Sequence, residues 1–197
     1  ARPRIGYGDG SGARQMTIEN LKQQVAAPDA PFEAFEGPWE PIEAELRTPL
    51  PQDYKDFVRL YGNGYFMEFL GIYVPRTSNP NTRFERKAPL ISRMFLEAAE
   101  EDDEELTYPF WPTPSGLISF GATDNGDMLF WRAQGHPDTW RVVIWDRGLQ
   151  TFEALDCDLT DFLAGLATGD IQPEAFPGDL LVCDHLFQPH TEGAGEE

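Results

Sequence analysis

The sequence contains few cysteines and no long apolar run. Its 197 residues include two cysteines, Cys157 and Cys183, far fewer than a small disulfide-stabilised secreted domain uses. Neither a secretory signal nor a run long enough to cross a bilayer is visible. We therefore expect a cytoplasmic, reduced setting without a membrane partner. Two free thiols are favoured there, and a single disulfide between them is the alternative.

Basic residues are also scarce. The chain has 15 Lys and Arg residues against 34 Asp and Glu residues, which gives a formal net charge of −19. A nucleic-acid surface needs clustered Lys and Arg to replace the counterions around phosphate, so we expect no nucleic-acid partner. Such a charge would instead attract a basic protein partner, although acidity can also serve solubility alone.

Recognisable catalytic and metal-binding motifs are absent. The sequence has neither a Gly-Lys-Ser/Thr phosphate loop nor a Gly-x-Ser-x-Gly elbow, and its three histidines have no neighbouring nucleophile pattern. Cys183, Asp184 and His185 are adjacent ligand types followed by His190, but zinc ligands normally converge from separate clusters. We therefore predict no catalytic residue, no cofactor and no metal, and we expect that the protein is not an enzyme.

The length of the chain fits one domain, which would bury about 70% of its unfolded surface. Residues 1–15 are rich in glycine and poor in apolar side chains, which predicts a disordered tail or an expression remnant upstream of Met16. We assign a single domain to residues 16–189, with a long insertion at about 76–107 and a flexible acidic tail at 190–197. The segment 171–189 shows no clear pattern.

Several segments have apolar residues at helical spacing. They are residues 17–27, a stretch from Ile42 that restarts at Pro51 and continues to Tyr61, residues 88–100, and residues 159–167. Thr17 and Asp158 are the expected N-caps, and Pro51 fits the first helical position. Gly62 and Gly169 are placed to end their helices.

Five further runs are β-prone. They are Tyr65–Val74, expected as one buried strand, then Leu117–Gly121, Asp127–Arg132, Arg141–Trp145 and Gln150–Ala154. Asn125-Gly126 predicts a two-residue turn with positive φ at both central positions, and Gly148 is the expected left-handed residue of the next loop. The last four runs make an antiparallel meander. The fold class is therefore α+β, with a central, mostly antiparallel sheet flanked by helices.

The order of these motifs resembles the SUKH superfamily. The resemblance rests on LPQDYKDFVRLYGNGYF, a long insertion, YPFWPTPSGLISFGATDNGDMLFW and VVIWD, and extends from Trp39 to about Gly169. The superfamily includes bacterial immunity proteins and the fungal Smi-one/Knr-four regulators of cell-wall synthesis. The resemblance implies a SUKH-like α+β domain. It also implies that many bacterial relatives bind and neutralise toxins, often nucleases, while other relatives act as regulatory or scaffolding modules with a cellular client.

One acidic segment is the first candidate for partner binding. The insertion changes abruptly from a basic to an acidic stretch, in which seven of the nine residues from Glu97 to Glu105 are acids. Its members are Glu97, Glu100, Glu101, Asp102, Asp103, Glu104 and Glu105. A solvated helix end would explain the run, and so would a surface that attracts a basic toxin and accelerates association.

Four other residues complete the predicted partner-binding set. Asp124 and Asp127 flank the Asn125-Gly126 turn, where a carboxylate either accepts backbone amides of the turn or contacts a partner. Trp111, in a proline-rich entry segment, is expected to be partly exposed, whereas Trp140 fits the core and the surface equally well. Trp131 and Trp145 lie within apolar runs and are expected in the core.

Overall fold

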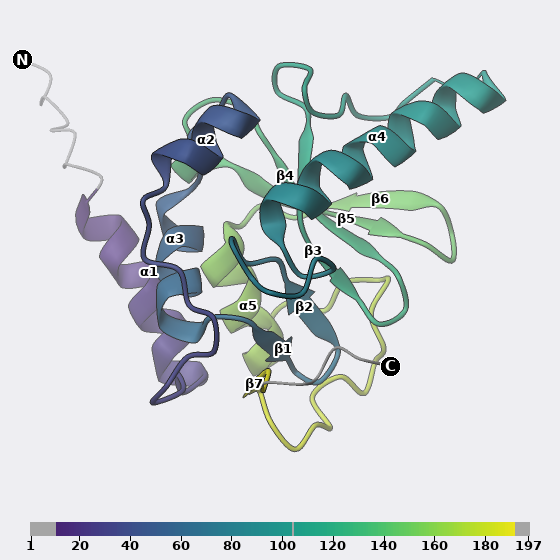
Figure 1. The fold of residues 1–197 in the computed structure, drawn as a ribbon. Coiled ribbons are helices and arrows are strands. Elements are labelled where there is room, and N and C mark those ends of the chain that lie inside the picture. Colours follow the sequence, from purple (N-terminus) through teal and green to yellow (C-terminus); the bar gives the residue numbers. More distant parts are fainter. Residues whose placement is uncertain (1–10, 104, 192–197) are drawn as a thin grey trace, which may run out of the picture.

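A seven-stranded antiparallel sheet organises the chain (Figure 1), whose structure, a computed structural model, describes residues 11–103 and 105–191. The strand order is β6-β5-β4-β3-β2-β1-β7. The strands are β1 (Gly64–Phe66), β2 (Leu70–Ile72), β3 (Leu117–Thr123), β4 (Met128–Arg132), β5 (Arg141–Asp146), β6 (Thr151–Ala154) and β7 (Phe187–Pro189). The predicted α+β class and the antiparallel meander from β3 to β6 are confirmed.

Helices cover the two faces of the sheet unequally. They are α1 (Ser11–Gln24), α2 (Glu40–Leu46), α3 (Gln52–Tyr61), α4 (Phe84–Asp102) and α5 (Leu159–Thr168), with a short 3-10 turn at Pro137–Thr139. α1, α3 and α5 pack together on one side. α4 packs on the other face, where Phe95 stacks on Phe110 and meets Trp145 edge to face at 5.0 Å. None of the described helices is both long and apolar enough to cross a membrane.

The first β-prone run forms a hairpin, so the prediction of one continuous strand over Tyr65–Val74 is wrong. β1 pairs with β2 across a tight turn at Met67 and Glu68, whose φ angles are 53° and 54°. Non-glycine residues seldom adopt this conformation. The turn carries no Gly, Asn or Asp signal, and the Met67 N–H is held by the Leu186 carbonyl at 2.8 Å. The Phe69 N–H also donates to the Phe66 carbonyl at 3.2 Å, so the turn combines a local bond with a contact made far along the chain.

In the loop between β3 and β4, three residues, 124–126, separate the hydrogen-bonded Thr123 and Asp127, where two were predicted. The backbone N–H of Thr123 donates to the carbonyl of Asp127, and the N–H of Gly126 donates to the carbonyl of Thr123, each at 3.0 Å. Gly126 has the predicted positive φ, 88°, but Asn125 does not share it. A type I turn followed by one left-handed residue is a common solution for such a loop. In the next loop the left-handed residue is Gln150, with φ 56°, and not Gly148.

The helices follow the predicted pattern with shifted boundaries. α1 begins at Ser11, so the expected cap at Thr17 is wrong and the tail predicted for residues 1–15 is already helical from residue 11, while residues 1–10 lie outside the description. Pro51 is the residue before α3 and not its first helical residue. α5 agrees with the sequence: Asp158 accepts the N–H of Asp161 at 2.9 Å, and Gly169 ends the helix with φ 79°.

The C-terminal segment returns to the sheet. β7 pairs with β1, and His190, which was assigned to a flexible tail, donates its backbone N–H to the carbonyl of Asn63 at 3.0 Å. The described chain ends at residue 191, so the rest of the predicted tail lies outside the description. Both cysteines are free thiols, as favoured from sequence.

Candidate functional site

The acidic end of α4 is the first candidate surface. We use this name for the described acids Glu97, Glu100, Glu101, Asp102, Asp103 and Glu105, all of which are exposed, while Glu104 lies outside the description. Figure 1 shows the last turns of α4 extending away from the body of the molecule. None of these six side chains has a hydrogen-bond or ion-pair partner among the described residues. The surface is therefore free to meet another molecule.

The charge at the acidic end opposes the helix on which it lies. α4 has no basic residue in its last turn, and its C-terminus already carries partial negative charge from the unpaired carbonyls. Carboxylates at this end are unfavourable by about 0.3–1 kcal/mol each at low salt, and Glu97 and Glu101 add a like-charge pair four residues apart. A cationic partner would remove this repulsion.

Trp111 is a structural tie as well as a partly exposed side chain. It is half-buried, and its indole N–H donates to the carbonyl of Leu46 at 2.8 Å. This bond joins the segment before β3 to the end of α2. The predicted partial exposure is confirmed, but the ring is fixed in place and its polar edge is already used.

Two of the predicted partner-binding residues are buried, and their assignment to a surface is wrong. Asp127 is 3% exposed, and its carboxylate accepts the hydroxyl of Thr123 at 2.7 Å and the backbone N–H of Arg147 at 3.1 Å. The carboxylate does not accept backbone amides of its own turn, as the alternative expected, but joins the turn to the loop between β5 and β6. Trp140 is also 3% exposed and packs 6.1 Å from Trp131, so it belongs to the core.

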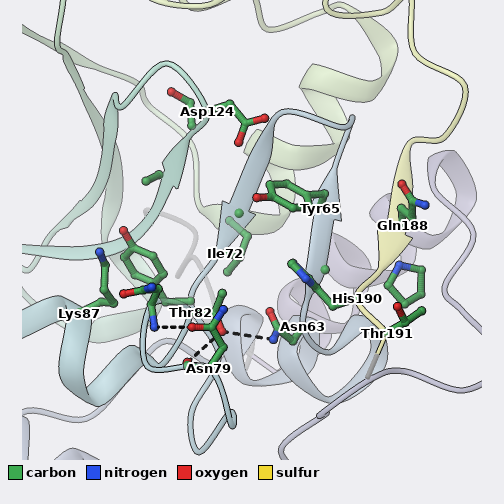
Figure 2. Close-up of a pocket in the computed structure, with 17 residues that line it drawn as sticks. Asn63, Tyr65, Ile72, Asn79, Thr82, Lys87, Asp124, Gln188, His190 and Thr191 are labelled. Carbon is green, nitrogen blue, oxygen red and sulfur yellow. Dashed lines mark hydrogen bonds between the residues drawn. The ribbon is translucent and has the colours of Figure 1, made fainter. Parts of the chain in front are cut away.

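Asp124 is exposed, as expected, but it lies elsewhere on the molecule. It follows β3 in the loop that leads to β4 and lies at the groove shown in Figure 2, which none of the acids at the end of α4 lines. No described residue pairs with its carboxylate, and partial burial raises its pKa above the ordinary 3.8. The predicted set therefore divides into two separate surfaces.

Asp124 belongs to a groove that the sequence analysis missed. Figure 2 shows this groove over the face of β1, β2, β3 and β7, with a volume of about 460 Å³. Its floor comes from a register row in which Gln188, Tyr65, Gly71 and Ala122 lie opposite one another on consecutive strands. The sequence signal for the groove was the pair of small residues Gly71 and Ala122. This pair predicts a hollow only when it is known that the two residues lie opposite each other on neighbouring strands.

The walls of the groove combine aromatic rings with charge. Tyr65 is 38% exposed, and its ring centroid lies 4.9 Å from that of His190. Lys87 of α4 lines the opposite side, with its Nζ 5.5 Å from the centre of the Tyr73 ring. Burial lowers the pKa of His190 below the ordinary 6.5, against the opposing effect of Glu33, which favours the neutral ring. The groove is therefore lined by one carboxylate without a partner among the described residues, Asp124, and by one cation, Lys87, which lies over the Tyr73 ring.

The described residues offer no site for a metal. No three or more His, Cys, Asp or Glu side chains lie together in the described part of the chain as ligands would. His185 approaches Glu68 at 3.3 Å, but Cys183 and Asp184 do not complete a ligand set with it. The absence of catalytic activity and of a cofactor stays a prediction.

Comparison with known proteins places the chain in a family. A search of curated proteins and of solved structures gave no match. The model of the SUKH_6 family, described as SMI1-KNR4 cell-wall, matches residues 36–163, which is more than half of the chain. The match begins in the connector before α2 and ends inside α5, so it includes the meander and α4. The chain therefore belongs to the SUKH superfamily, as the order of its sequence motifs indicated.

Proposed function

We propose that this protein is a non-enzymatic, cytoplasmic immunity protein that binds a basic toxin domain and blocks it by occlusion. The observation that carries the proposal is the acidic end of α4, which projects from the body with six described carboxylates that lack any partner. Family membership supports it, because SUKH proteins often serve immunity. The net charge of −19 supports a basic partner. A nuclease domain is one such partner, because it needs basic residues to bind nucleic acid.

The acidic end would act mainly on the rate of encounter. Exposed charges of one sign steer an oppositely charged protein and raise the association rate by about 10- to 1000-fold at low salt. Tight binding would depend on a few desolvated contacts elsewhere in the interface. Inhibition needs no chemistry from this chain, because occupation of the toxin surface is sufficient.

A regulatory module with a cellular client is the second candidate. The observation in favour of such a client is the description of the matching family, which refers to the cell wall. Both functions would use the same acidic surface. The neighbouring gene separates them, since a toxin gene beside this one supports immunity and its absence supports the regulatory role.

The test uses charge reversal at the acidic end. Glu100, Glu101, Asp102 and Asp103 are replaced by Lys, which changes the net charge by +8, from −19 to −11. A control variant makes the same change at exposed acids elsewhere, namely Asp29, Glu36, Glu174 and Asp179. Both variants should fold, because exposed substitutions usually change stability by within about 0.5 kcal/mol each.

The readouts are survival of cells that express the adjacent toxin and stopped-flow association of the purified pair. At 0.01 M salt, where the Debye length is about 30 Å, the reversed variant should associate at least about tenfold more slowly than the control. The difference should shrink as salt is added. Equal rates for the two variants would place the interface elsewhere, and survival without any binding would refute occlusion.

A further inference from the structure

The groove beside Tyr65 is a built hollow in an otherwise continuous sheet surface. In the register row that crosses the sheet, Gly71 pairs with Ala122, and Ala122 pairs with Met128. The two small residues therefore lie between the larger side chains of Tyr65 and Met128. A Cβ atom placed on Gly71 would meet only the carbonyl oxygen of Ala122, at 3.9 Å. Space is present above this floor.

The helix that covers this face does not close the hollow. Phe95 of α4 packs on Trp145 and Phe152, at the β5–β6 side of the same face. Only Lys87, near the start of α4, reaches the edge of the groove. Figure 2 shows the groove bounded by Lys87 on one side and by Tyr65 and His190 on the other, with Asp124 at its rim. A hollow of about 460 Å³ is large enough to receive a side chain of another molecule.

We propose that the groove receives an arginine side chain of a basic protein partner, with the guanidinium at Asp124 and the stem over Gly71 and Ala122 beside the Tyr65 ring. The proposal rests on the proposed function only in that the partner is a basic protein. Guanidinium is the cation that combines a two-pronged bond to a carboxylate with stacking on an aromatic face. Asp124 has no partner among the described residues, so its oxygens are available.

The charge of the whole chain favours a cation over an anion. Within the groove, Lys87 and Asp124 are opposite charges on different parts of the rim, and Lys87 lies over the Tyr73 ring, which leaves Asp124 for an incoming cation. The whole chain carries −19, which repels an anionic ligand before it arrives. Asp124 is partly desolvated, which strengthens its attraction for an incoming cation relative to a fully solvated carboxylate.

The test measures binding of a small probe to the full chain, with no toxin required. N-acetyl-arginine amide is titrated into isotope-labelled protein while backbone amide shifts are followed by NMR. N-acetyl-citrulline amide, which has nearly the same shape without the charge, is the matched control probe, and inorganic phosphate tests the anion alternative. We expect saturating shifts at Tyr65, Gly71, Ala122 and Asp124 with the arginine probe alone.

Two variants separate the groove from general charge attraction. Asp124→Asn should weaken the arginine probe about tenfold, the factor that corresponds to about 1.4 kcal/mol of a charge-assisted hydrogen bond, whereas the control Asp179→Asn should leave binding unchanged. Gly71→Leu should fill the groove and abolish the shifts. Because its Cβ meets no close atom, the variant should fold, and Tyr65→Ala provides an independent test if it does not.

Three results with the wild-type protein would overturn the proposal: no shifts with the arginine probe, equal shifts with the citrulline probe, or phosphate shifts centred on Lys87 in place of arginine shifts. A fourth would come from Gly71→Leu, if the arginine shifts persist there and spread over the acidic end of α4. The probe experiment does not depend on a toxin, so failure of immunity leaves its result standing. Conversely, toxin neutralisation that survives Asp124→Asn and Gly71→Leu would overturn only the role of the groove.

Discussion

Asp53 makes a pH-dependent link between two helices, and its replacement by Asn provides a sharp test. It is 7% exposed in the first turn of α3. One carboxylate oxygen accepts the N–H of Tyr54 at 2.7 Å, and the other accepts the N–H groups of Leu159 and Thr160 at the start of α5, at 2.9 and 3.2 Å. The carboxyl group therefore caps a helix 106 residues away in the chain.

The environment of Asp53 favours the protonated form. Burial, reinforced by the nearby charge of Asp158, raises its pKa from the ordinary 3.8 to about 7, against the opposing effect of the three backbone N–H groups. Between these two values the folded state retains a proton that the unfolded state has released. Stability therefore falls as pH rises through this window, by up to about 1.4 kcal/mol per pH unit, and the loss levels off above pH 7.

The expected magnitude follows from the two pKa values. Between pH 5 and pH 8 this single group should lower the free energy of unfolding by about 2 to 3 kcal/mol. Asp53→Asn cannot titrate, so the wild-type protein should lose that amount relative to the variant over the same range. At pH 5 the variant should be less stable by about 1 kcal/mol, because its amide group presents a donor where one N–H needs an acceptor.

The assay is urea unfolding of both proteins at pH 5, 6, 7 and 8, followed by fluorescence, with Asp179→Asn as an exposed control. A difference in unfolding free energy between wild type and Asp53→Asn that is the same at pH 5 and pH 8, within about 0.5 kcal/mol, would show that the carboxyl is ionised throughout. That result would refute the reasoning, because the three N–H bonds would then outweigh burial.

Three further predictions concern single positions and metal content. Gly126→Val should lower the free energy of unfolding by about 1–3 kcal/mol, since φ is +88° there and a new Cβ would lie 2.8 Å from Arg147 Cδ; an unchanged urea midpoint would contradict it. Cys157 should react with iodoacetamide at pH 8 more slowly than free cysteine, because burial raises its pKa to about 12; an equal rate would refute this. Purified protein should contain no stoichiometric zinc and keep its urea midpoint in a chelator, whereas elemental analysis that finds one zinc per chain would contradict the prediction.

Local sequence signals were sufficient to predict the helices and strands whose ends are set by neighbouring residues. Asp158 caps α5 by accepting the N–H of Asp161, and Gly169 ends the helix, so both boundaries have a local signal, although the N–H groups of Leu159 and Thr160 are satisfied by the distant Asp53. The strands of the meander alternate with short loops, and the apolar pattern alone predicts them. The same local reasoning failed at Met67 and Glu68, where the Met67 N–H donates to the distant Leu186 carbonyl and supports a turn that has no sequence signature.

The partner-binding predictions failed or succeeded for a similar reason. Acidity of the α4 end is a property of consecutive residues, so the sequence shows it directly, and the structure adds its projection from the body. Asp124 and Asp127 look equivalent in the sequence. The three-residue loop turns one into solvent and buries the other at 3% exposure, so the exact loop length decided which carboxylate is available.

The sequence by itself determined four properties of this protein: its α+β class, the order of its motifs, its family and the acidity that favours a basic partner. The tertiary structure decided the groove, because its floor joins the β1–β2 hairpin residues Tyr65 and Gly71 to Ala122 and Gln188, which are distant in the chain. A shift of one residue in any strand would turn these side chains to the opposite face. Strand register is fixed by the packing of the whole sheet, and for that reason no local pattern could have predicted the groove.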